Sequence, residues 1–186
     1  MVLGVPDPAL GGDGVVLRLP NDDDAAWITS ACNDPEIARF IGLPTPYTEA
    51  DARSFLARVD RGWTSETEAV FVVEGANDGE PLGLVELHLT TGDPALASLG
   101  YWVRAEVRGR GVATLAVLLV AHWAFDELGV YRLELTTAPD NVASQRVAER
   151  AGFTREGMLR GWMATPSGRR DSVMFSLLAS DLAEAP

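Results

Sequence analysis

Alternating hydrophobic and polar residues recur along the chain and predict a series of β-strands. The clearest is "VYRLELTTA", and "AVFVVE" and "PLGLVELHLT" stand on either side of the turn residues "GANDGE" as in a β-hairpin. The predicted strands are residues 15–20, 69–74, 81–90, 96–103, 130–138, 153–160 and 169–178. Short turns join several of them, so we expect a mostly antiparallel sheet.

Helical spacing and capping residues predict about four helices. Thr48 and Asp51 have the spacing of a capping box, and Gly152 stands where a glycine often ends a helix. The predicted helices are residues 21–34, 48–63, 112–128 and 141–152. The third is apolar on almost every side and should be deeply buried. Because it connects two predicted strands, the sheet should also contain one parallel pair.

Length and composition indicate one α/β (α+β) domain. The chain has 186 residues, of which 47% are hydrophobic and 23% are charged. Residues 1–14 are rich in glycine and proline, so we expect a flexible N-terminal arm. Residues 15–180 should form a single domain, because no repeat or linker interrupts them.

The formal net charge of −12 argues against partners that need a basic surface. Nucleic acids and anionic membranes are therefore not expected as partners, whereas an amine-bearing partner suits the charge. All 15 basic residues are arginines, which excludes a mechanism through a lysine Schiff base.

The cysteine and histidine content argues against a disulfide, a cysteine metal cluster and a multi-histidine metal site. Cys32 is the single cysteine and His88 and His122 are the two histidines, so an internal disulfide is excluded and no metal is expected. The first residues lack the features of a signal peptide, and no stretch is apolar enough to span a bilayer. We expect a cytoplasmic protein without membrane contact, and the sequence leaves a homodimer open.

The segment "EVRGRGVAT" at residues 106–114 gathers glycines and arginines just before the predicted buried helix. Gly109 and Gly111 let the backbone approach a ligand closely, and the first turn of a helix offers free N–H groups. This pattern predicts an anion site, with phosphate as the usual occupant. A P-loop is excluded because it needs a lysine, and a dinucleotide-binding fingerprint needs glycine where Thr114 stands. The alternative is an ordinary strand–helix turn with solvated arginines.

The sequence around this segment resembles the GCN5-related N-acetyltransferase (GNAT) family. "RGRGVA" at 108–113 matches that family's Arg/Gln-x-x-Gly-x-Gly/Ala signature, and it follows "LGYWV" and precedes a buried helix in the family's order. "DNVASQRVAERAGFTREGMLR" at 140–160 resembles the ribosomal-protein-alanine N-acetyltransferases, the branch that acetylates the N-termini of ribosomal proteins. The resemblance covers about residues 15–180.

The resemblance implies the GNAT fold and its reaction. The fold has a central mixed, mostly antiparallel sheet of six to seven strands, about four flanking helices, and two parallel strands that splay apart at the cofactor cleft. The reaction moves an acetyl group from acetyl-CoA (coenzyme A) to a primary amine of a protein N-terminus or a small molecule, by direct attack in a ternary complex. Cys32 is far in sequence from the signature and is not expected to carry the acyl group.

The sequence is also compatible with three alternatives. One is a transferase for a larger donor such as succinyl-CoA, whose extra charge Arg39 or Arg160 would meet. Another is a module that binds acyl-CoA without catalysis. The last is a structural domain in which the glycine-rich segment is only a turn.

The resemblance also implies which residues bind the cofactor. Backbone N–H groups of the signature should hold the pyrophosphate, and residues 101–103 should pair with the pantetheine arm. Asn141 should contact that arm, and Ser144 stands where the branch proposes an acid for the leaving thiolate; a helix cap and first turn are the alternatives. The expected cofactor-binding residues are Tyr101, Trp102, Val103, Arg108, Gly109, Arg110, Gly111, Val112, Ala113, Thr114, Asn141 and Ser144.

Glu86 and His88 are the candidates for removing a proton from the amine. They are two residues apart on a predicted strand, so both side chains should face the same side of the sheet. A carboxylate near the cleft is the family's common base, so Glu86 is assigned this role, with His88 as second candidate and acceptor contact. Tyr101 is an alternative to Ser144 as acid. A solvated strand face is the alternative for the pair.

The acceptor should lie against the segment 21–63, which is rich in aromatic and acidic residues. Trp27, Phe40 and Tyr47 are its candidate contacts, and the same residues would serve equally well in the core.

The chain departs from the ribosomal-protein branch in one respect. That branch often carries a glutamate, proposed as base, a few residues after the segment that ends here at Arg160. In this chain "GWMATPSG" follows, and Asp171 is the next acid. Trp162 and Met163 are then candidates for the acceptor pocket or for packing in a hairpin.

Overall fold

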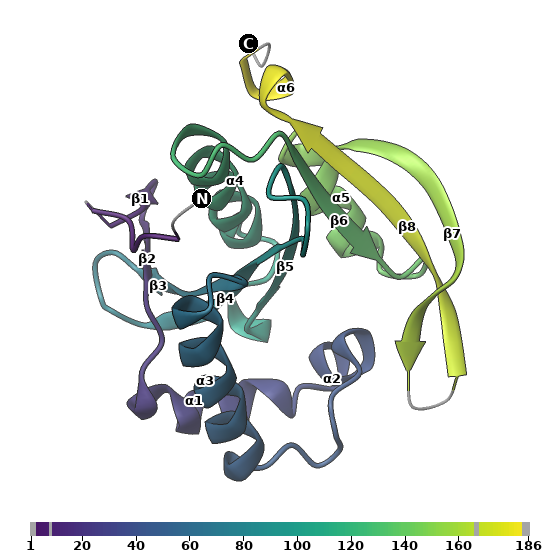
Figure 1. Ribbon diagram of the computed structural model, residues 1–186. Coiled ribbons are helices and arrows are strands. Elements are labelled where there is room, and N and C mark those ends of the chain that lie inside the picture. Colours follow the sequence, from purple (N-terminus) through teal and green to yellow (C-terminus); the bar gives the residue numbers. More distant parts are fainter. Residues whose placement is uncertain (1–2, 8, 166–167, 184–186) are drawn as a thin grey trace.

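The computed structural model describes residues 3–7, 9–165 and 168–183, which form a twisted eight-stranded sheet with helices on both faces (Figure 1). The strand order is β1-β2-β3-β4-β5-β6-β8-β7. The strands are β1 (Gly11–Gly12), β2 (Val15–Arg18), β3 (Glu68–Gly75), β4 (Pro81–Leu89), β5 (Leu96–Val103), β6 (Arg132–Thr137), β7 (Thr154–Thr165) and β8 (Gly168–Leu178). The helices are α1 (Ala25–Cys32), α2 (Pro35–Ile41), α3 (Glu49–Thr64), α4 (Val112–Asp126), α5 (Val142–Arg150) and α6 (Ala179–Ala183), with 3-10 turns at Asp22–Asp24 and Ala105–Val107.

The predicted fold class is confirmed, because β5 and β6 are parallel and the other paired strands are antiparallel. The element counts differ from the prediction. The two-residue β1 and the short α6 are additional, and the predicted helix 21–34 is a 3-10 turn followed by α1. A separate helix, α2, starts at Pro35 with Asp34 as its cap, because proline suits a first helical position and cannot continue a preceding helix.

Two hydrophobic cores lie on opposite faces of the sheet. Along β4, Val85 and Leu87 belong to the core beneath α4, whereas Leu84 belongs to the core beneath α1 and α3. Val117 and Val120 of α4 are fully buried, as the apolar pattern of this helix predicted.

The segment ahead of β2 contacts the domain. Leu3 is buried in the core beneath α4, and Gly11 and Gly12 pair with Val16 and Val15. In the part of the chain that the structure describes, no helix combines the length and apolar character needed to cross a bilayer.

The parallel strands β5 and β6 are paired only at their beginnings. Their register runs from Leu96 with Arg132 to Ser98 with Glu134. Beyond this point β6 stays paired with β8 as far as Thr137, while β5 stays paired with β4 as far as Val103. The ends of β5 and β6 therefore splay apart, as the resemblance implied, and leave a free backbone edge on β5.

Candidate active site

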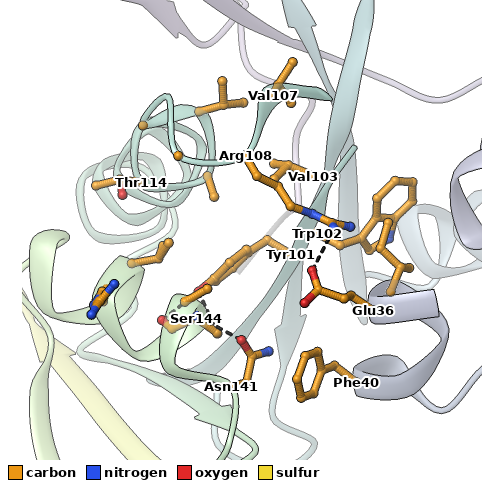
Figure 2. Close-up of a pocket in the computed structure, with 18 of the residues that line it drawn as sticks. Glu36, Phe40, Tyr101, Trp102, Val103, Val107, Arg108, Thr114, Asn141 and Ser144 are labelled. Atoms are coloured by element: carbon orange, nitrogen blue, oxygen red, sulfur yellow. Dashed lines mark hydrogen bonds and ion pairs between the residues drawn. The ribbon is translucent and has the colours of Figure 1, made fainter. Parts of the chain in front are cut away.

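A cavity of about 390 Å³ lies beside the splayed end of β5 (Figure 2). Its walls come from α2, β5, the N-terminal turn of α4 and the beginning of α5, represented by Phe40, Tyr101, Gly111 and Ser144. All of the predicted cofactor-binding residues except Arg110 line this cavity. The fold thus brings the glycine-rich segment together with Asn141 and Ser144, which are distant from it in sequence.

The N-terminus of α4 faces this cavity with unpaired backbone donors. Gly111 is its N-cap with φ +85°, and Gly109 has φ +74°, conformations that favour glycine. No side chain among the described residues caps α4, and its first turn holds no acid. Because the first N–H groups of a helix lack intrahelical partners, this end can bind an anion.

The side chain of Arg108 is directed to α2. Its guanidinium donates a hydrogen bond to Asp34 Oδ1 at 2.6 Å. It donates another to Glu36 Oε2 at 2.7 Å (Figure 2). Burial acts to raise the pKa of Asp34, but hydrogen bonds from Arg108 and the α2 backbone outweigh it and lower that pKa. The charge of Arg108 is therefore largely balanced by α2, and its backbone is the part offered to a ligand.

The other end of α2 is tied to the opposite side of the cavity. Arg39 forms an ion pair with Asp140, the residue before α5, and Asp140 also contacts Arg170 of β8 at 3.2 Å. The helix therefore bridges the two sides of the splayed strands.

Two arginines of α5 supply positive charge that the sequence analysis missed. Arg146 and Arg150 both line the cavity. They are four residues apart, so they lie on one face of α5, and this helical spacing was the signal available in the sequence.

Tyr101, Ser144 and Asn141 form a hydrogen-bonded group in the cavity. The Tyr101 hydroxyl lies 2.8 Å from Ser144 Oγ and donates to the Ser144 carbonyl at 3.1 Å. Asn141 accepts from the Ser144 N–H at 3.1 Å and thereby caps α5. Burial raises the pKa of Tyr101 to about 12 although the Ser144 hydrogen bond lowers it, so the phenol keeps its proton at neutral pH.

Glu86 lies on the other face of the sheet, next to the same splayed stretch. It pairs in register with Gly100 of β5, which carries no side chain. Tyr101, the next residue, faces the α4 side. The Tyr101 phenol and the Glu86 carboxylate thus lie on opposite faces of the sheet, near the splayed ends of β5 and β6.

Glu86 belongs to a cluster with Glu68, His88 and Arg58. One carboxylate oxygen of Glu68, one of Glu86 and a ring nitrogen of His88 lie within 4.8 Å of one another. Arg58 already forms ion pairs with both carboxylates, at 3.7 Å for Glu86. The expectation that no metal is bound stays a prediction.

The three predicted acceptor contacts are separated by the structure. Phe40 lines the cavity. Trp27 donates to Asp24 at 2.6 Å and packs on Trp102, and Tyr47 is 7% exposed in the core beneath α1 and α3. Trp27 and Tyr47 are thus packed outside the lining of the cavity, and their role as acceptor contacts stays a prediction.

The long β7–β8 hairpin holds the residues around the departure from the ribosomal-protein branch. Asp171 accepts the N–H of Gly161 at 2.7 Å and fixes a β-bulge in β7, so its carboxylate is engaged within the hairpin. Trp162 is 56% exposed, and neither Trp162 nor Met163 is among the residues lining the cavity.

Splayed parallel strands beside an uncapped, glycine-led helix form the cofactor cleft expected of an N-acetyltransferase. Residues 15–154 match the family model described as "Acetyltransferase (GNAT) domain", and the chain belongs to this family of N-acetyltransferases.

Known relatives include enzymes for different amines. A putative ribosomal N-acetyltransferase of Bacillus subtilis, YdaF, is 35% identical over 101 residues, which cover 54% of this chain and 55% of that protein. Spermidine N(1)-acetyltransferase of Escherichia coli is 30% identical over 145 residues, covering 78% and 75%. Mycobacterium smegmatis RimJ in complex with CoA-disulfide has a similar fold, with a TM-score of 0.83 at 24% identity over 92% of this chain and 85% of that one.

Proposed function

We propose that this protein transfers the acetyl group of acetyl-CoA to a primary amine, on a protein N-terminus or a small molecule. The observation that carries the proposal is that the free edge of β5 and the uncapped N-terminus of α4 meet in one cavity.

The residues of this cavity fit coenzyme A. The N–H groups of Gly109, Gly111 and the first turn of α4 can bind the pyrophosphate, with Arg146 and Arg150 adding positive charge. The free edge of β5 at residues 99–103 can pair with the amides of the pantetheine arm. The fold neighbour RimJ, solved in complex with CoA-disulfide, supports this assignment.

Tyr101 is the acid and Glu86 the base of this proposal: Tyr101 lines the cavity, and Glu86, which is not among the lining residues, lies on the other face of the sheet opposite Gly100. Glu86 accepts the proton that the amine loses as its nitrogen bonds to the acetyl carbon. Tyr101 donates its phenolic proton to the thiolate as the C–S bond breaks, and the Ser144 hydroxyl at 2.8 Å connects it to further donors. The products are the N-acetylated amine and free coenzyme A.

The acetyl group is a better fit than a charged acyl group. Arg39, one candidate to meet a succinyl carboxylate, is paired with Asp140. Arg160 is exposed on β7 and is not among the residues lining the cavity. A succinyl carboxylate would therefore meet no unpaired arginine from either candidate.

Calorimetric titration with acetyl-CoA, followed by mass spectrometry on an amine panel, tests the proposal. The panel should contain peptides with free N-termini and spermidine, because relatives named for ribosomal and spermidine acetylation share this family. We expect micromolar binding and an acetylated product. Binding without any product would instead favour the non-catalytic module, and no binding to acetyl-, succinyl- or free CoA would refute the cofactor site.

A further inference from the structure

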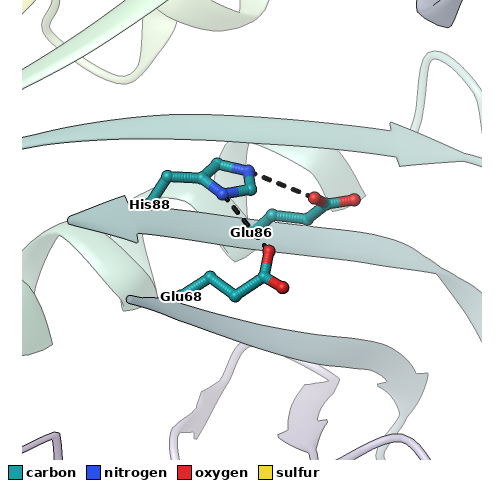
Figure 3. Close-up of side chains that lie close together, drawn as sticks. All are labelled: Glu68, Glu86 and His88. Carbon is teal, nitrogen blue, oxygen red and sulfur yellow. Dashed lines mark ion pairs between the residues drawn. The ribbon is translucent and has the colours of Figure 1, made fainter. Parts of the chain in front are cut away.

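Three side chains form a continuous chain of contacts on the sheet face beneath α1 and α3 (Figure 3). His88 Nε2 lies 3.2 Å from Glu86 Oε2, and His88 Nδ1 lies 3.4 Å from Glu68 Oε2. The β3–β4 register explains the arrangement, because Glu68 pairs directly with His88 while Glu86 is two residues away on the same face.

Of these three side chains, the imidazole of His88 is the most exposed to solvent. The side chain of Glu68 is 8% exposed and that of Glu86 is 17% exposed, whereas His88 is 41% exposed. Among the three, His88 is therefore the group with the best access to water.

We propose that His88 conducts the proton from Glu86 to solvent and that Glu68 is a positioning residue for the His88 ring. This inference rests on the proposed acetyl transfer with Glu86 as base. It adds a route by which Glu86 loses its proton to solvent after each turnover.

The two ring nitrogens have distinct tasks in this route. With a proton on Nδ1 directed at Glu68, the lone pair of Nε2 faces Glu86 and can accept its proton. A carboxylate that holds Nδ1–H in this way fixes the tautomer and stabilises the imidazolium that forms.

The charged groups around His88 allow this transfer. Arg58 of α3 forms ion pairs with both carboxylates, so its guanidinium lies on the same cluster as the ring of His88. Cys32 of α1 is buried near Glu86, and burial raises the pKa of its thiol to about 12. Burial also raises the pKa of Tyr47 to about 12, so both neighbours are neutral and contribute no competing charge.

The protons balance over one turnover. An amine that enters as an ammonium must lose two protons before the amide is complete, and Tyr101 returns only one proton to sulfur. Tyr101 is then reprotonated through Ser144 and water, and protons that Glu86 accepts leave by way of His88. The overall result is one proton released to solvent per ammonium consumed.

Kinetics of His88→Ala test the conducting role. We expect kcat to fall about tenfold or more, while the Kd for acetyl-CoA is unchanged, and free imidazole to restore part of the rate. His122→Ala, on the exposed side of α4, is the matched control and should keep its rate with or without imidazole. A full rate in His88→Ala, or a loss that imidazole does not repair, would overturn the relay.

Nitrogen NMR of the imidazole rings tests the positioning role without turnover. His122→Ala assigns the two histidines, and we expect the neutral His88 ring to carry its proton on Nδ1. Glu68→Met should shift that proton towards Nε2 and change the pH profile of kcat. Glu74→Met, on the same strand but paired with Arg18, should do neither.

These outcomes separate the two proposals. A wild-type protein that acetylates no amine would refute the proposed function, whatever the NMR shows. An active wild type whose His88 tautomer is the same in Glu68→Met would refute the positioning role of Glu68 and leave acetyl transfer standing.

Discussion

Gly100 of β5 lies directly opposite Glu86 of β4, so no side chain of that residue stands between the carboxylate and the splayed gap. A Cβ built on Gly100 would lie 4.0 Å from the Glu86 Cβ, which is ordinary van der Waals contact. Packing therefore does not require a glycine at this position.

A bulky side chain at Gly100 should lower the rate by blocking access to Glu86 and leave the affinity for acetyl-CoA unchanged. Gly100→Val places methyl groups between Glu86 and the gap, so we expect kcat to fall about tenfold or more, about 1.4 kcal/mol in the barrier. Gly100→Ala, whose Cβ fits without a clash, should keep most of the rate. Steady-state kinetics and calorimetry with acetyl-CoA provide the check, and equal rates in the two variants would contradict the idea.

Gly111→Val tests the anion site at the start of α4. A branched side chain disfavours φ +85°, so the turn must rearrange, and we expect the Kd for acetyl-CoA to rise about tenfold or more, about 1.4 kcal/mol. Gly92→Val is the matched control, because Gly92 also has φ +85° and open space, and lies in the β4–β5 turn. If both variants bind acetyl-CoA like the wild type, the site is wrongly assigned.

Tyr101→Phe should lower kcat about a hundredfold and leave acetyl-CoA affinity nearly unchanged, because the ring still lines the cavity but the proton donor is gone. Since the pKa of Tyr101 is raised to about 12, the wild-type kcat should not fall through loss of this proton up to about pH 10. Ser144→Ala is the companion variant and should be milder. A full rate in Tyr101→Phe would remove Tyr101 as the acid.

Asp24 should contribute stability that is lost in acid. Burial acts to raise its pKa, but hydrogen bonds from Arg18, Trp27 and the Asn21 backbone outweigh it, and the pKa is lowered on folding. Its contribution is therefore complete above the ordinary aspartate range and disappears as the pH falls through the lowered pKa. Asp24→Asn should reduce the free energy of unfolding near neutral pH by about 2 kcal/mol, measured by urea denaturation. The exposed neighbour Asp23 provides the control, and Asp23→Asn should change little.

Most of the cavity lining could be predicted from the sequence because the glycine-rich turn and the helix after it are local features. Gly109, Gly111 and the apolar helix after them form one continuous segment, and the family order supplied Tyr101 and Ser144.

The contacts around Glu86 and Arg108 were not predictable. Glu68 preceded the predicted strand 69–74, and its pairing with His88 depends on a register that the hydrophobic pattern does not fix. Arg108 and Asp34 are 74 positions apart in the sequence, and local sequence patterns do not predict contacts at such a separation.

The ion pairs at both ends of α2 make the cleft sensitive to the solution around it. Arg108 holds one end through Asp34 and Glu36, and Arg39 holds the other through Asp140. Glu36, Arg39 and Asp140 are exposed, so dissolved ions weaken their attraction. Ionic strength thus adjusts how firmly this helix spans the cleft, and the buffer becomes one of the variables that set the shape of the cavity.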